Sequence, residues 1–143
     1  MNKMNKKEAF AFFGIKQTNE RWSWAGIRED KSLVALTIWN DQKDYERSGK
    51  WETSVFGMNN PIWKDSKGNK ERIEIIKYCI ENLDGKFRVI WMEPKERGVM
   101  DETREYLWAK PEKKSWFKIR DFDEETGEFS SDNFDDLLSS ANE

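Results

Sequence analysis

The chain has 143 residues, of which 36% are hydrophobic and 37% charged, and its formal net charge is −3. This length suits one domain with its own core, and the near-neutral balance excludes a uniformly basic nucleic-acid binder. The sequence contains no histidine and one cysteine, Cys79, which excludes internal disulfides, Cys/His zinc sites and histidine-dependent nucleophiles.

The first third of the chain predicts a short helix followed by a β-hairpin. Residues 6–13 combine helix formers with an apolar face, and Gly14 supplies a C-terminal stop. Residues 22–27 and 33–39 are strand-like and flank the polar loop "REDKS". Alternate positions of the second segment are apolar on both faces, which predicts a central strand.

The middle of the chain predicts a long polar excursion and then a helix. Residues 40–70 carry one edge-strand candidate, "WETSVF", among glycines, asparagines and a proline. In residues 69–85, Ile73, Ile76, Ile80 and Leu83 repeat at helical spacing. We therefore expect the most regular helix of the chain there.

The last third predicts further strands and an acidic tail. Residues 86–92 and 115–122 are strand-like, "DETREYLW" suggests a helical turn, and "DEETGEF" suggests a turn with a brief return strand. All 25 Lys and Arg precede residue 121, whereas the end of the chain is rich in Ser and Asp. We expect a single α+β domain over 1–130 and a flexible acidic C-terminal tail over 131–143.

The element order predicts an α+β fold, with a curved, mainly antiparallel sheet or half-open barrel and two to three flanking helices. Strict β-α-β alternation is missing, which disfavours a doubly wound parallel fold. The apolar N-terminal stretch is too short for a membrane span and lacks a cleavage pattern. We expect a cytoplasmic protein that does not associate with membranes.

Tryptophans around the predicted hairpin are the first candidate binding feature. Stacking of a base on an aromatic side chain contributes roughly 1–3 kcal/mol, so two indoles can hold one nucleotide. The alternative is that these indoles fill the core. An acid beside them would accept a hydrogen bond from a base edge, and basic residues would contact phosphate. The predicted ligand-binding residues are Trp22, Trp24, Trp39, Asp41, Arg88, Lys95 and Arg104.

Basic residues of the second half form a wider candidate surface. They are interleaved with aromatic residues, a mixture that suits phosphates and stacked bases. Acidic residues occupy the same stretch, so a self-paired, solvated surface is the alternative. The basic residues are Arg88, Lys95, Arg97, Arg104, Lys110, Lys113, Lys114, Lys118 and Arg120.

A metal-dependent nuclease is a third candidate. Asp84 precedes the strand that ends in Glu93-Pro94-Lys95, and nucleases of the PD-(D/E)xK type use an acid followed by Glu-x-Lys to hold Mg²⁺. The proline interrupts the alternation that would project Glu93 and Lys95 to one side. We therefore predict no catalytic residues, no metal and no cofactor.

The segments "NERWSWAG", "LVALTIWNDQ", "GKFRVIWMEPK" and "IRDFDEETGEF" resemble a family of small bacterial proteins. Its members share the Trp-Ser-Trp segment, a strand ending in Trp with a nearby Asp, and a D-x-x-T-G-x-F ending. The resemblance spans about residues 12 to 129 and implies a folded unit without an assigned activity. The expected architecture is also similar to PUA-like domains, which include EVE and SRA readers of modified bases and often occur in restriction systems.

These observations favour a non-catalytic binding module that recognises a nucleic acid base or nucleotide, including modified bases, in a restriction or phage-defence context. The alternative is a protein-interaction or inhibitor module of phage or mobile-element origin, because tryptophan is enriched at interface hot spots. A nuclease using Glu93 and Lys95 is the third hypothesis.

Overall fold

The computed structural model describes residues 4–19, 23–39, 43–44, 52–54, 67–95, 106–125, 127 and 129–135. These ranges contain the helices α1 (Lys6–Phe12) and α2 (Lys67–Asn82). The strands are β1 (Ala25–Ile27), β2 (Val34–Trp39), β3 (Lys43–Asp44), β4 (Glu52–Ser54), β5 (Lys86–Pro94), β6 (Tyr106–Pro111), β7 (Ser115–Phe122) and β8 (Phe129–Asp135).

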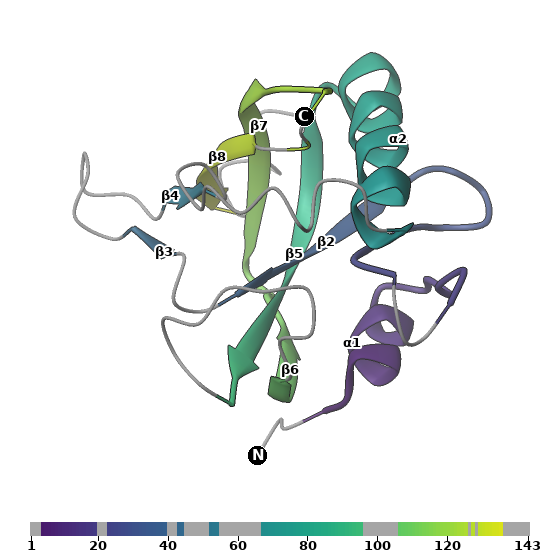
Figure 1. The fold of residues 1–143 in the computed structure, drawn as a ribbon, viewed down its shortest axis with the longest axis vertical. Coiled ribbons are helices and arrows are strands. Elements are labelled where there is room, and N and C mark those ends of the chain that lie inside the picture. The colour runs from purple at the N-terminus through teal and green to yellow at the C-terminus, as the bar shows by residue number, and fades with distance from the viewer. Residues whose placement is uncertain are drawn as a thin grey trace.

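The described strands form one open, mainly antiparallel sheet in the order β1-β2-β5-β7-β8-β4-β3, with β6 also paired to β5. Only β2 and β5 pair in parallel among these neighbours, and the chain between them includes α2. α1 lies at the β6 end of the sheet and α2 near the turn between β7 and β8 (Figure 1). The predicted α+β class with a mainly antiparallel sheet is confirmed, with two helices in the described ranges.

α1 begins and ends where the sequence predicts. The Asn5 side chain accepts a hydrogen bond from the Glu8 amide at 2.8 Å, and the Asn5 amide donates to Glu8 Oε1 at 3.0 Å, which completes a capping box. Gly14 follows the helix with φ +74°, a conformation that glycine adopts without strain.

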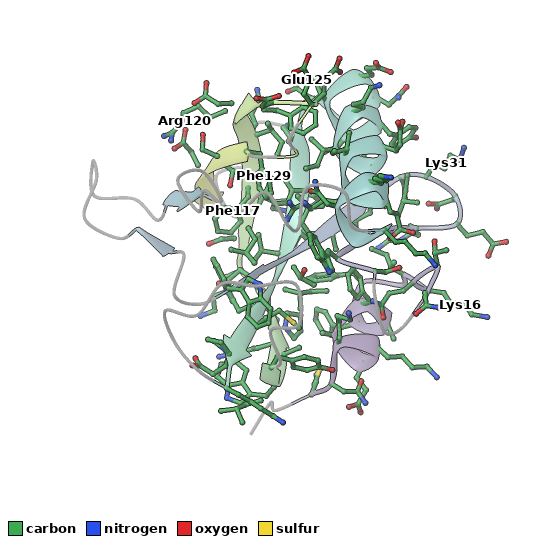
Figure 2. The ribbon with its side chains drawn as sticks, in the orientation of Figure 1. Lys16, Lys31, Phe117, Arg120, Glu125 and Phe129 are labelled. Atoms are coloured by element: carbon green, nitrogen blue, oxygen red, sulfur yellow. The ribbon has the colours of Figure 1, made fainter. Side chains whose placement is uncertain are left out.

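One core lies between the sheet and α2. Val34, Leu36 and Ile38 of β2 pack with Ile76 and Cys79 of α2. Aromatic residues from the other strands complete it, and Figure 2 shows Phe117 and Phe129 in the interior beside β7 and β8. The burial of Val34, Leu36 and Ile38 confirms one of the two apolar faces predicted for this strand.

A second core lies on the α1 side. Ala35 of β2 and Ile90 and Met92 of β5 pack with Ala9 and Phe10 of α1. Both faces of β2 are therefore buried, as the two-sided apolar pattern predicts.

The buried face of α2 agrees with the predicted one at Ile76 and Leu83, which pack in the α2-side core, and differs at Ile80. Arg72, Ile76 and Cys79 are buried, whereas Ile80 is 42% exposed. These three residues follow i, i+4, i+7 spacing and so share one stripe. The helix therefore turns a charged residue, and not Ile80, toward the interior. Neither α1 nor α2 has the length and apolar content that a membrane-crossing helix needs.

The predicted helical turn over "DETREYLW" is wrong in its described part, because Tyr106, Leu107 and Trp108 belong to strand β6. These residue types favour strands. β6 pairs with the edge of β5 opposite β2, and this pairing holds Tyr106, Leu107 and Trp108 in an extended conformation.

β6 and β7 run along the same edge of β5, separated by a bulge. Pro111 of β6 pairs with Ile90, and Phe117 of β7 pairs with Phe87. The chain therefore advances six residues from β6 to β7 while the paired positions on β5 are three residues apart. Three residues, 112–114, are therefore extra, and a bulge of this kind bends the strand.

The expected boundary at residue 130 falls inside β8. This strand pairs with β7 as far as Asp135, opposite Ser115. Apolar Phe129 and the buried Ser130 and Ser131 anchor its first half. The paired part of the chain thus extends five residues beyond the predicted body.

The Cys79 thiol should not react with thiol reagents while the protein is folded. Its side chain is 1% exposed, its Sγ donates to the Lys86 carbonyl at 3.2 Å, and burial raises the pKa of the thiol to about 12. Since the thiolate is the reactive form, we expect no reaction with a disulfide reagent at pH 8 until urea unfolds the chain. Rapid labelling of the native protein in a colorimetric thiol assay would contradict this placement.

Candidate functional site

Buried or half-buried polar side chains come from α1, from residues 17 and 23–24, and from the first turns of α2. Five of them are at most 8% exposed, whereas Trp24 and Glu71 are half-buried. Because buried polar groups need partners, such a group is the first place to look for a binding site. We call this group the polar junction; its members are Lys6, Gln17, Ser23, Trp24, Asn69, Glu71 and Arg72.

Arg72 lies at the centre of the polar junction. Its guanidinium carbon is 5.0 Å from the centroid of the Trp24 ring and 5.5 Å from that of Phe129. Burial lowers the pKa of Arg72 to about 9, so the group is still charged at neutral pH. A cation held against aromatic faces is stabilised by the ring quadrupoles.

The first turn of α2 fixes the position of this guanidinium. Arg72 Nη2 donates to Asn69 Oδ1 at 2.7 Å and to the Gly127 carbonyl at 3.4 Å. Gly127 has φ +85°, and a Cβ there would overlap the Asn69 amide. The glycine therefore lets the turn after β7 approach α2 closely.

Residues before β1 contribute further hydrogen bonds to the polar junction. Gln17 Nε2 donates to the Ser23 carbonyl at 3.3 Å, and Ser23 Oγ accepts from the Asn19 amide at 3.0 Å. The Trp24 carbonyl accepts from the Thr37 amide at 3.0 Å. These bonds fix the positions of Gln17, Asn19 and Ser23 relative to one another.

Lys6 is the member of the polar junction that belongs to α1. Burial lowers the pKa of the Lys6 ammonium to about 8, and the charge of Glu71 partly offsets this effect. The Lys6 amide donates to the Tyr106 hydroxyl at 2.9 Å, which ties this end of α1 to β6. The polar junction thus contains two basic side chains, Lys6 and Arg72, and one acidic side chain, Glu71.

The predicted tryptophan platform is only partly described. Trp24 joins the polar junction through Arg72, whereas Trp39 is half-buried and packs against the α1-side core. The two residues come from adjacent paired segments, but their ring contacts differ. Trp22 and Asp41 lie outside the described residues.

Arg88, predicted as a phosphate contact, has a packing role. It is 7% exposed, and its guanidinium lies 4.7 Å from the Trp116 ring centroid and 5.3 Å from that of Phe13. Its Nη2 donates to the carbonyls of Glu112 and Lys113, both at 2.9 Å. Arg88 therefore holds the bulge between β6 and β7. Lys95 is exposed at the end of β5, and Arg104 lies outside the described residues.

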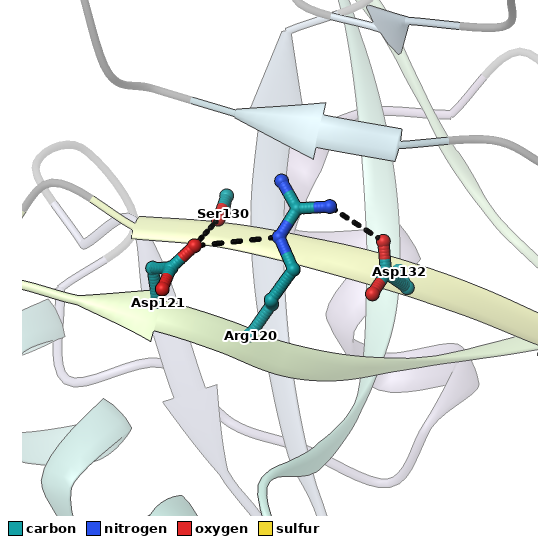
Figure 3. Close-up of polar contacts among 4 residues, drawn as sticks. All are labelled: Arg120, Asp121, Ser130 and Asp132. Carbon is teal, nitrogen blue, oxygen red and sulfur yellow. Dashed lines mark hydrogen bonds and ion pairs between the residues drawn. The ribbon is translucent and has the colours of Figure 1, made fainter. Parts of the chain in front are cut away.

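The wider basic surface is partly self-paired. Arg120 lies between two carboxylates, with Nε 3.3 Å from Asp121 and Nη1 2.9 Å from Asp132, and Ser130 Oγ also donates to Asp121 (Figure 3). Lys118 Nζ lies 3.4 Å from Asp84. These pairs leave less positive charge for phosphate on β7 than the sequence suggests.

The residues of the nuclease hypothesis lie at opposite ends of a strand. Asp84 precedes β5, whereas Glu93 and Lys95 are at its other end. Nine residues of strand span about 30 Å at the usual rise per residue. Asp84 and Glu93 are too far apart to share a metal ion, and the described ranges contain no group of three acidic, His or Cys side chains suited to one.

A scan of protein-family models and searches of curated proteins and solved structures found no match to this chain. The predicted family and the PUA-like likeness therefore stay predictions.

Sequence reasoning identified Trp24 but missed the other members of the polar junction. Arg72 could have been found, because it lies four residues before Ile76 and so on the same stripe of α2. No local pattern marks Lys6 or Gln17. Their burial depends on the packing of α1 and of the irregular segment that follows it.

Proposed function

We propose that the protein is a non-catalytic binding module that takes a nucleobase or nucleotide at the polar junction. The observation that carries this proposal is the half-buried Trp24 indole, whose ring lies against the buried Arg72 guanidinium. A half-buried indole beside buried hydrogen-bonding groups suits a flat polar ring.

Positive charge near the polar junction supports a phosphorylated ligand. Lys67 and Lys70 are exposed in the first turn of α2, where the helix dipole is also positive. Lys6 and Arg72 add two charges against the one of Glu71. This balance favours an anionic nucleotide over a cationic ligand.

The other ligand contacts predicted from the sequence are part of this proposal. Trp22, two residues before Trp24, would supply a second stacking face, and Asp41 and Arg104 would contact the base edge and the phosphate. Trp39 and Lys95 would lie at the margin of the ligand. A PUA-like architecture and a role in restriction or phage defence belong to the same proposal, since an open sheet with a helix on each face is compatible with both.

Binding of nucleotides should depend on Trp24. We expect Trp24→Leu to weaken binding of 5′-mononucleotides or short single strands by about tenfold or more, because one base stack contributes about 1–3 kcal/mol. Trp24→Phe keeps a ring against Arg72 and should retain part of the affinity. Isothermal titration calorimetry measures both effects.

The matched control is Trp108→Leu, since Trp108 is another half-buried indole but lies on β6. It should bind like the wild-type protein. Melting curves of all variants separate loss of binding from loss of folding. Absence of binding by the wild-type protein at millimolar nucleotide would refute the proposal.

A second candidate function, a protein-interaction module, is favoured by exposed apolar side chains on neighbouring elements. Phe12 of α1 is 49% exposed and Leu107 of β6 is 61% exposed. Lys113 Nζ lies 5.2 Å from the Phe12 ring centroid. A stoichiometric protein retained by the wild-type chain but not by a Phe12→Ser, Leu107→Ser variant would favour this function, and equal retention would argue against it.

A further inference from the structure

Two lysines and a phenylalanine are exposed together at the bulge between β6 and β7. Lys113 and Lys114 are exposed residues of this bulge. Lys113 Nζ lies 5.2 Å from the centroid of the Phe12 ring, and that ring is 49% exposed. An apolar ring therefore lies beside positive charge that faces solvent. We call Phe12, Lys113 and Lys114 the bulge surface.

The bulge separates its acidic side chain from its basic ones. The half-buried Glu112 carboxylate accepts hydrogen bonds from Trp91 Nε1 at 3.0 Å and from the Lys114 amide at 3.3 Å. Trp91 is only 3% exposed, so this carboxylate is turned toward the interior. The ion pairs of the described residues involve neither the Lys113 nor the Lys114 ammonium. The bulge surface is thus locally positive, although the chain has a net charge of −3.

The buried Arg88 side chain fixes the shape of this surface. Its Nη2 donates to the carbonyls of Glu112 and Lys113, both at 2.9 Å. Its guanidinium also lies against the Phe13 ring, and the Phe12 ring packs on Phe13 with centroids 5.2 Å apart. Binding of a partner to a surface that is already ordered costs less conformational entropy than binding to a loose loop.

We propose that the bulge surface binds an acidic peptide segment of a partner protein, with a large apolar side chain among its carboxylates; this rests on the second candidate function. Carboxylates of the segment pair with the Lys113 and Lys114 ammonium groups. The apolar side chain covers the exposed part of the Phe12 ring. Charge complementarity and burial of apolar area then act at the same place.

A single-stranded nucleic acid fits the bulge surface less well. Stacking of a base needs an open ring face, whereas the Lys113 ammonium lies over the Phe12 ring and Phe13 packs edge-on against it. The net charge of −3 also opposes the approach of a long polyanion. A short acidic segment meets neither obstacle to the same degree.

The probes are fluorescein-labelled peptides, and fluorescence anisotropy measures their binding. The first peptide carries aspartates on both sides of a Leu-Phe pair. In the second peptide the aspartates are asparagines, and in the third Leu-Phe is Gly-Gly. We expect the first to bind about fivefold or more tightly than either of the others, because ion pairs and apolar contact both contribute. Its affinity should fall as sodium chloride is added, since the lysines are exposed.

The matched variants are Lys113→Glu and Lys110→Glu. Lys110 is also exposed, but it pairs across the strands with Trp91, whose ring lies in the α2-side core, so the Lys110 side chain belongs to the other face of the sheet. Lys113→Glu should weaken binding of the first peptide by about fivefold or more, and Lys110→Glu by less than about twofold. Phe12→Ser should weaken it by about threefold or more. Melting curves check that the variants fold.

Several outcomes overturn the assignment. If the first peptide does not bind at millimolar concentration, if the asparagine peptide binds equally well, or if Lys110→Glu matches Lys113→Glu, the bulge surface does not select acidic segments. If an oligothymidylate binds more tightly than the peptide and depends on Lys113, the surface is a nucleic-acid contact. In each case a protein partner retained through Phe12 and Leu107 leaves the second candidate function standing, and without such a partner both fail.

Discussion

Replacing Arg88 with alanine should lower the free energy of unfolding by about 3–5 kcal/mol. The change removes a buried side chain that packs between Phe13 and Trp116. It also leaves the carbonyls of Glu112 and Lys113 without the donor that they have now. A hydrogen bond to a charged group contributes about 1.5–3 kcal/mol, and the lost packing adds to this. Urea unfolding followed by circular dichroism measures the effect.

Arg88→Lys separates packing from phosphate binding. Lysine keeps the charge but cannot reproduce the planar, stacked guanidinium, so we expect about half of the stability loss and no loss of nucleotide affinity. Lys118→Ala is the control, because its surface pair with Asp84 should contribute less than about 1 kcal/mol. A stable Arg88→Ala variant that no longer binds nucleotide would restore the phosphate role predicted from the sequence.

Regular elements were predictable from the sequence because their signals are local. The stop at Gly14 and the two-sided apolar pattern of β2 are each encoded within a few residues. β6 was not predictable in this way. Its charged surroundings suggest a helical turn, and only pairing with β5, distant in sequence, makes it a strand.

The candidate site was less predictable than the fold, because it depends on contacts between distant segments. Charged and amide residues are usually exposed, so nothing near Lys6, Gln17 or Glu71 in the sequence marks them as partners. The indoles were visible from composition, but their neighbours were not. Arg88 shows the converse: a basic residue on a strand suggests a ligand contact, whereas the bulge opposite it gives that side chain an internal role.

Lys6→Met should increase the free energy of unfolding by about 2–3 kcal/mol at pH 7. Burial lowers the pKa of Lys6 to about 8, against 10.5 in the unfolded chain. The unfolded state therefore binds the proton more tightly, and the ammonium costs the folded state about 3 kcal/mol at any pH below 8. As the pH rises from 8 to 10.5 this cost disappears, so stability attributable to Lys6 rises with pH.

The measurement compares urea unfolding of the wild type and Lys6→Met at pH 7 and pH 10, where the difference should fall below about 1 kcal/mol. Lys7→Met is the matched control: Lys7 is the next residue of α1 and is exposed, so its effect should stay within about 0.5 kcal/mol at both pH values. A destabilised Lys6→Met variant at pH 7 would show that Glu71 and the other partners of the ammonium outweigh its desolvation. In that case Lys6 would be a structural ion pair, and the positive charge that favours an anionic ligand in the polar junction would already be neutralised.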